Sequence, residues 1–262
     1  ARLRHLSEPV HLSPQLANDL MEPGKKAENR IGYQSIPQTD SLGRNIFYVI
    51  ALTIVAGFVE VTGYMDCEGL YASIMTGNTV QLGMNFTHAE WVKFGLVGYA
   101  IALFFVACSI ASLIRRHLAN PLMELVIMSG VLSLACLVRL DPSLNLVLEL
   151  PLLSLALAMQ GETIARFGGV SLQTLVVTNN IVKFSDAFTG RFISRRFLEK
   201  TGQKVPTLPE AVLPGISWLT YSVAAAIAAL ANSLTPFTLL VPAIIILVVA
   251  ADLRKLPTSS TH

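Results

Sequence analysis

The sequence predicts an all-α polytopic membrane protein with six transmembrane helices and two short re-entrant helices, arranged as an inverted 3+3 repeat. First, 53% of the 262 residues are hydrophobic and only 14% are charged, whereas a soluble domain is about a quarter charged. Second, apolar runs of about 18 residues or more, long enough to cross a bilayer, recur from Asn45 onward. Third, two segments of the chain resemble each other, as expected of a duplicated membrane unit.

The internal repeat aligns residues 57–83 with residues 159–185 without a gap. The identical pairs are Glu60 with Glu162, Leu70 with Leu172, Thr76 with Thr178, Asn78 with Asn180 and Val80 with Val182. An acid and a Thr-x-Asn triplet thus recur in a chain where polar residues are scarce. This match favours duplication over a chance similarity of apolar runs.

The elements follow from hydropathy along the chain. Residues 1–44 are polar and broken by prolines, which predicts a cytoplasmic tail; a docking arm for a partner is the alternative. Membrane repeat 1 is expected at 45–143, membrane repeat 2 at 144–255 and a C-terminal tail at 256–262. The predicted spans are 45–65, 91–114, 122–138, 144–166, 211–230 and 236–251.

Two segments, 69–86 and 168–188, are too polar for lipid-facing spans and too apolar for free loops. Basic residues favour the cytoplasmic side. If both segments are re-entrant, the basic clusters at 115–116, 191–204 and 254–255 all lie inside with the N-terminal tail. Each half then has an odd number of spans, so the second half is inverted relative to the first.

The two triplets are expected to meet near the membrane midplane, because non-helical backbone at that depth must be satisfied by protein or a water-filled cavity. The candidate substrate-binding residues are Glu60, Thr76, Gly77, Asn78, Glu162, Thr178 and Asn180. Glu60 is also a candidate proton or cation site. The alternatives are hydrogen bonds between helices for the triplets and snorkelling toward headgroups for the acids.

Other acidic residues are expected at the membrane surface. Glu124 and Glu149 lie near span starts, which predicts interfacial positions. Asp66 and Glu68 predict a solvated loop or an outer acidic mouth. Cys67 in that loop is expected to face outside.

The same residues resemble a known family. The motifs are Gly57-Phe58-Val59-Glu60-Val61, Gly69-Leu70-Tyr71, Met75-Thr76-Gly77-Asn78, Ala158-Met159-Gln160-Gly161-Glu162, Arg166-Phe167-Gly168 and Thr178-Asn179. Over residues 45 to 255 the chain looks like the YoaK-like family of bacterial integral membrane proteins, which has no agreed function. The resemblance implies the fold. Gln160, in the second half, is a further candidate substrate-binding residue. Glu60, Gly161 and Asn179 depart from the family pattern, so the resemblance implies no ligand.

The leading functional hypothesis is a transporter or channel-like protein for a small solute, in the bacterial inner membrane, with both termini cytoplasmic. The alternative is an accessory or assembly subunit of a larger membrane complex; a homo-oligomer is also open. No catalytic constellation, metal motif or cofactor motif is visible. We therefore expect no enzyme activity, no metal and no cofactor. The net charge of +2 indicates no nucleic-acid partner.

Overall fold

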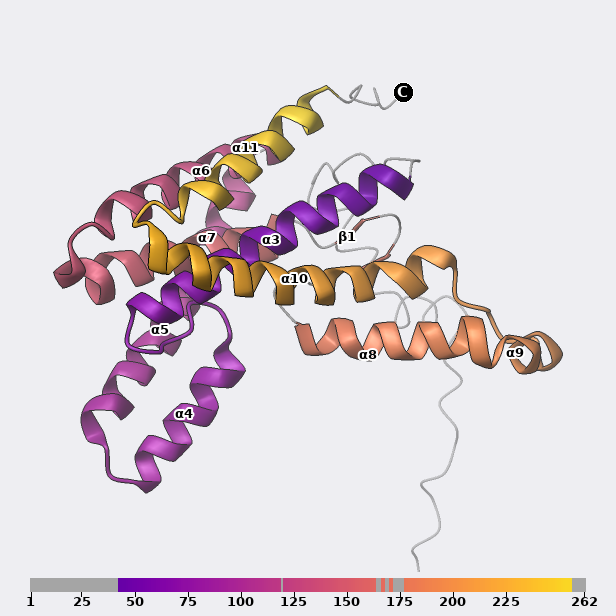
Figure 1. Cartoon of the computed structure of the whole chain (residues 1–262), viewed down its shortest axis with the longest axis horizontal. Coiled ribbons are helices and arrows are strands. Elements are labelled where there is room, and N and C mark those ends of the chain that lie inside the picture. Colours follow the sequence, from indigo (N-terminus) through magenta and orange to yellow (C-terminus); the bar gives the residue numbers. More distant parts are fainter. Residues whose placement is uncertain (1–41, 119, 164–165, 168–169, 172–176, 256–262) are drawn as a thin grey trace, which may run out of the picture. The chain divides into compact units, whose positions relative to one another are not determined.

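Helices make up almost all of the described chain (Figure 1). The computed structural model describes residues 42–118, 120–163, 166–167, 170–171 and 177–255, all within the unit Ile36–His262. The helices are α3 (Leu42–Asp66), α4 (Met75–Thr87), α5 (Trp91–His117), α6 (Pro121–Val138), α7 (Leu150–Thr163), α8 (Val177–Phe188), α9 (Arg195–Thr201), α10 (Leu208–Leu234) and α11 (Leu240–Arg254).

Short elements connect these helices. The remaining ones are the 3-10 turn η1 (Pro142–Leu144), the π-helical turns η2 (Asn145–Glu149) and η3 (Thr189–Ile193), and the antiparallel strands β1 (Arg166–Phe167) and β2 (Val170–Ser171). Both η1 and η2 directly precede α7, so together they extend its membrane segment. The prediction of a helical fold is therefore confirmed.

Four segments are long and apolar enough to cross a membrane. They are Ile46–Asp66 in α3, Trp91–His117 in α5, Pro142–Gly161 through η1, η2 and α7, and Leu208–Leu234 in α10. A shorter apolar helix spans Leu122–Val138. The chain is thus a multi-pass helical membrane protein, while the count of six spans stays a prediction.

Local sequence explains where several helices begin. Asn120 caps α6 by accepting the Leu122 N–H at 2.9 Å, and Pro121 supplies a helical φ at the first position. At the start of α10, Thr207 and Glu210 form a reciprocal capping box. These side chains satisfy amide groups that the helices cannot satisfy themselves.

The helix α3 lies at the centre of the packing. It contacts α7, α10 and α11, and 72% of its most apolar stretch is buried, against 22% for α5. A Cβ at Gly57 would lie 3.1 Å from the Ala224 Cβ and 3.2 Å from the Tyr221 carbonyl oxygen of α10. Small residues let membrane helices approach closely, which explains why α3 and α10 lie side by side (Figure 1).

Helices α4 and α8 begin at corresponding positions of the two aligned segments. Helix α4 begins at Met75 and α8 begins at Val177, and these positions coincide when 57–83 is aligned with 159–185. The two halves differ in the segments after these helices. A short turn joins α4 to α5, whereas η3 and α9 lie between α8 and α10.

Candidate functional site

Glu60 is a buried carboxylate in α3, only 2% exposed. Its Oε2 accepts the N–H of Ala72 at 3.1 Å, and its Oε1 accepts the N–H of Ser73 at 2.8 Å and the Ser73 hydroxyl. Both donors immediately precede α4, where the positive end of the helix dipole favours a negative group. Glu60 therefore fixes the start of α4 against α3.

Asn78 of α4 also binds the segment between α3 and α4. This fully buried side chain accepts the Tyr71 N–H at 3.1 Å and donates to the Tyr71 carbonyl oxygen at 2.9 Å. Ser154 of α7 donates to the Ala72 carbonyl oxygen at 3.0 Å. Residues 71–73 are thus bound by side chains from α3, α4 and α7.

Gly77 accommodates the ring of Tyr71. A Cβ at Gly77 would lie 2.7 Å and 2.9 Å from two ring carbons of Tyr71, closer than packed atoms allow. That ring also packs on Tyr64, with centroids 4.7 Å apart. The neighbouring Thr76 is exposed. In this structure Gly77 serves close packing.

Replacing Gly77 with alanine should therefore lower the free energy of unfolding by about 1–3 kcal/mol, as overpacking does. Gly83→Ala on the same helix is the matched control, because nothing lies within 4 Å of a Cβ there. Alanine at that position should be neutral or stabilising. Denaturant unfolding of the purified protein in detergent measures both. Equal losses would mean that Tyr71 does not pack on Gly77.

In the second half, Asn180 of α8 is fully buried and donates to the Ser217 hydroxyl of α10 at 3.1 Å. Ser217 in turn lies 3.2 Å from the Thr53 hydroxyl of α3. Gln160 of α7 is also buried and donates to the Leu52 carbonyl oxygen at 2.7 Å. Polar side chains of the second half thus reach α3 near its middle.

The remaining predicted residues are less involved. Thr178 is exposed, and Glu162 lies in the last turn of α7 with its side chain outside the described part. Along α3, Thr53 and Glu60 are about 10 Å apart, since each residue rises 1.5 Å. Asn78 bonds to Tyr71, next to the residues that Glu60 of α3 binds, whereas Asn180 bonds to Ser217, which contacts Thr53 of α3. A single site shared by both triplets stays a prediction.

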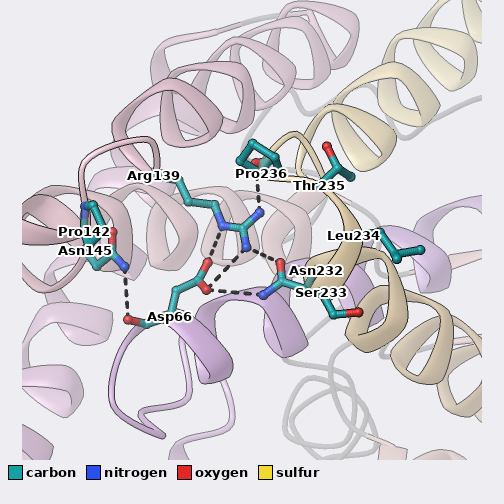
Figure 2. A pocket seen from close by; sticks show the side chains of 9 residues that line it. All are labelled: Asp66, Arg139, Pro142, Asn145, Asn232, Ser233, Leu234, Thr235 and Pro236. Atoms are coloured by element: carbon teal, nitrogen blue, oxygen red, sulfur yellow. Dashed lines mark hydrogen bonds and ion pairs between the residues drawn. The ribbon is translucent and has the colours of Figure 1, made fainter.

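A polar cluster that the sequence did not predict lies at one end of the bundle (Figure 2). Arg139, just after α6, forms an ion pair with Asp66 at the end of α3, and both side chains are mostly buried, at 8% and 15% exposure. Arg139 also donates to the Asn232 amide oxygen and, at 2.9 Å, to the Pro236 carbonyl oxygen. These groups line a pocket of about 320 Å³. Asp66 is therefore a mostly buried ion-pair partner in the last turn of α3, and not the solvated loop residue that was expected.

Glu149 lies close to this cluster. It was expected at the membrane interface, but it is completely buried inside the protein, with Asp66 and Arg139 as charged neighbours. Glu124 is likewise buried, at 2% exposure. Among the described residues, no group of three or more His, Cys, Asp or Glu side chains is arranged to hold a metal ion.

Cys67 is buried, while its position on the outer side of the membrane stays a prediction. Its side chain is fully buried and its thiol lies 3.5 Å from the Asn145 carbonyl oxygen. Burial raises the pKa of the Cys67 thiol, and the carboxylates of Glu149, Asp66 and Glu68 act in the same direction. We expect this thiol to react poorly with aqueous reagents.

A second pocket, of about 480 Å³, lies at the opposite end of α3. There the Tyr48 hydroxyl donates to Asp252 of α11 at 2.9 Å, and Arg44 lies 3.8 Å from the same carboxylate. The contact ties the start of α3 to the end of α11.

Comparisons with known proteins identify relatives without an assigned activity. The sequence model of a family described as "Protein of unknown function (DUF1275)" matches residues 48–251. The "UPF0700 transmembrane protein YoaK" of Bacillus subtilis (strain 168) is 24% identical over 188 residues, covering 69% of this chain and 81% of the relative. No solved structure matches the chain.

Proposed function

The chain belongs to the DUF1275 family, as its resemblance to YoaK-like proteins predicted, and on that premise we propose that it carries a small solute across a membrane between two inverted repeats. The relative is named a transmembrane protein, and the helices of this chain agree with that. The case for solute passage comes from the arrangement of the helices and from the buried polar groups.

The helix contacts support a pseudo-symmetric arrangement. Exchanging α3 with α7, α4 with α8, α5 with α10 and α6 with α11 leaves the main contacts unchanged. The α3–α10 contact corresponds to the α7–α5 contact. The α4–α5 contact corresponds to α8–α10, and the α6–α7 contact corresponds to α11–α3. The contacts of α3 with α7 and of α6 with α11 map onto themselves. Duplicated membrane units pack in this way.

Hydrogen bonds give the directions of the paired helices. Ser129 of α6 bonds to Ala243 of α11, and Cys136, further along α6, bonds to Pro236, which lies just before α11. The two helices therefore run in opposite directions. Likewise Leu52 of α3 bonds to Gln160, whereas Asp66 bonds to Asn145. Corresponding helices are therefore antiparallel, which supports inverted repeats.

The path of the chain also supports a re-entrant α4. Helix α3 ends beside Arg139 and Asn145, and α5 passes this end at Tyr99, which bonds to the Leu146 carbonyl oxygen at 3.1 Å. Helix α4 and the first turns of α5 therefore form a hairpin that leaves and returns to one end of the bundle (Figure 1). The 13 residues of α4 span about 20 Å, short of a hydrocarbon core of about 30 Å.

The observation that carries the proposal is the Glu60 carboxylate, which is buried in a transmembrane helix and bonded to the start of α4. Acids inside membranes face bundle interiors or cavities and mark solute or ion pathways. Inverted-repeat transporters bind solutes where half-helix N-termini point toward the midplane. Glu60 is such a buried acid, and it bonds to residues 72 and 73 just before the N-terminus of α4, which on this proposal faces the midplane.

Cysteine labelling tests the topology. In a cysteine-free background, single cysteines at exposed Glu68 and exposed His117 should be labelled from opposite sides of the membrane. The basic residues near His117 predict that side as cytoplasmic. An impermeant thiol reagent on intact cells should modify position 68 only, and position 117 after permeabilisation. Labelling of both positions in intact cells would contradict the six-span arrangement.

Solute passage is tested in liposomes containing the purified protein. Light scattering should show that at least one solute among urea, glycerol and neutral amino acids enters faster than into protein-free liposomes. Asn180→Ala, which removes the bond to Ser217, should slow entry, while Glu90→Gln at an exposed turn should not. Entry of every solute at the protein-free rate would contradict the proposal.

One observation favours the alternative of an accessory subunit. The connection from η3 through α9 has no counterpart in the first half and exposes Phe192, Ile193 and Phe197 at 55%, 72% and 63%. Arg195 and Lys200 lie on the same short stretch. Such a surface fits a partner protein or the headgroup region. Native purification in stoichiometric association with a larger complex would favour this alternative.

A further inference from the structure

The turn η2 (Asn145–Glu149) lies between η1 and α7 and forms an early turn of this membrane segment. It is π-helical, closed by the Leu150 N–H on the Asn145 carbonyl oxygen. Single π-turns in α-helices occur often at functional sites. Because a π-turn bonds residue i to residue i+5, Asn145 and Glu149 lie on nearly the same face.

Three oxygen atoms on this face are buried without a hydrogen-bond partner in the described part of the chain. They are both carboxylate oxygens of Glu149 and the amide oxygen of Asn145. Glu149 is 0% exposed. The Asn145 amide nitrogen donates to the Asp66 carbonyl oxygen at 3.2 Å, which leaves its oxygen as an open acceptor. Buried acceptors of this kind require a donor or a cation.

Two charged groups act on Glu149, the Asp66 carboxyl and the Arg139 guanidinium. Asp66 lies within hydrogen-bonding reach of Glu149, but two ionised carboxylates have no proton to share and only repel each other. Arg139 donates to Asp66, Asn232 and the Pro236 carbonyl oxygen. With both carboxylates ionised, the two acids and one guanidinium leave one negative charge uncompensated.

We propose that Glu149 and Asn145, beside Asp66, bind one alkali-metal cation, with sodium as the reference ion. A carboxylate and an amide oxygen are ligands that hard cations prefer. A proton on Glu149 would satisfy one of the three oxygens, whereas a metal ion contacts all three. The net charge of −1 selects a monovalent ion.

The nearby pocket is the proposed route of the cation to this site. Asn145, Asp66 and Arg139 line the pocket of about 320 Å³ at the end of the bundle, and Figure 2 shows Asn145 bonded to Asp66 at its edge. The cation would enter there. The proposed site does not depend on solute passage, so cation binding is tested separately from transport.

The test is thermal unfolding of the purified full chain in detergent, with choline chloride replaced stepwise by sodium chloride at constant ionic strength. Sodium should raise the unfolding midpoint of the parent protein by about 5 °C, saturably. Glu149→Gln should lose this response, whereas Glu90→Gln, at an exposed turn, should keep it. Equilibrium binding of radioactive sodium to the parent protein gives a second measurement, which holds even if Glu149→Gln does not fold.

Two results would overturn the proposal. One is an unfolding midpoint that is equal in sodium and choline, with no saturable sodium binding. The other is a midpoint that responds to pH but not to sodium, which assigns the positive charge to a proton. In that case the groups facing Glu149 are Asp66, Arg139, Cys67 and Cys136.

Discussion

Replacing Glu60 with alanine should lower the free energy of unfolding by about 3–5 kcal/mol, because hydrogen bonds to a buried charged group contribute about 1.5–3 kcal/mol each and do not add fully. The substitution removes the acceptor for two backbone N–H groups, of Ala72 and Ser73, and for the Ser73 hydroxyl. Ala72 is completely buried, so water does not readily replace the carboxylate. Denaturant unfolding of the purified protein in detergent measures the loss.

Glu60→Gln separates two roles for this residue. An amide has one acceptor oxygen, so its NH2 group would face the N–H of Ala72 or Ser73. The hydrogen bonds therefore predict that glutamine also destabilises the protein. If Glu60 were a proton carrier without this anchoring role, Glu60→Gln would leave the protein fully stable. Glu90→Ala, at an exposed turn, is the control and should leave stability unchanged.

Hydropathy was sufficient to predict the long helices. The expected spans 91–114 and 122–138 correspond to α5 (Trp91–His117) and α6 (Pro121–Val138). Apolar runs of this length have few other stable conformations in a bilayer. The polar segments were harder to place, because 69–86 contains both the loop held by Glu60 and the helix α4. Composition alone does not separate those two parts.

The candidate site was only partly predictable. The duplication singled out Glu60, Asn78 and Asn180, and all three are buried. Their partners are backbone groups of Ala72, Ser73 and Tyr71 or the Ser217 hydroxyl. No periodicity predicts such partners, because they depend on how helices pack.

Arg139 and Asp66 show the same limit more clearly. Asp66 was expected in a loop, and nothing in the sequence links it to Arg139, 73 residues away. Their pairing requires that α3 and α6 end together. Glu149 was missed for a related reason: its distance from a span start does not reveal which neighbours bury it.

Replacing Arg139 with methionine should lower the free energy of unfolding by about 3–5 kcal/mol, the usual loss when one partner of a buried ion pair is removed. Asp66 would keep its charge without the guanidinium, and the Asn232 amide oxygen and Pro236 carbonyl oxygen would lose their donor. Arg195→Met is the matched control, because that arginine pairs with Glu199 on an exposed helix, at 62% and 52% exposure. It should cost at most about 0.5 kcal/mol.

A double-mutant cycle gives the reason for the loss. If the cost of Arg139→Met arises from the unpaired carboxylate, adding Asp66→Asn should recover part of it, and the double variant should be more stable than the sum of the single losses predicts. Additive losses would mean that Arg139 stabilises the protein mainly through Asn232 and Pro236. Those two residues belong to the second half, whereas Asp66 belongs to the first, so the cycle also shows whether Arg139 stabilises its own half or joins the two halves at this end.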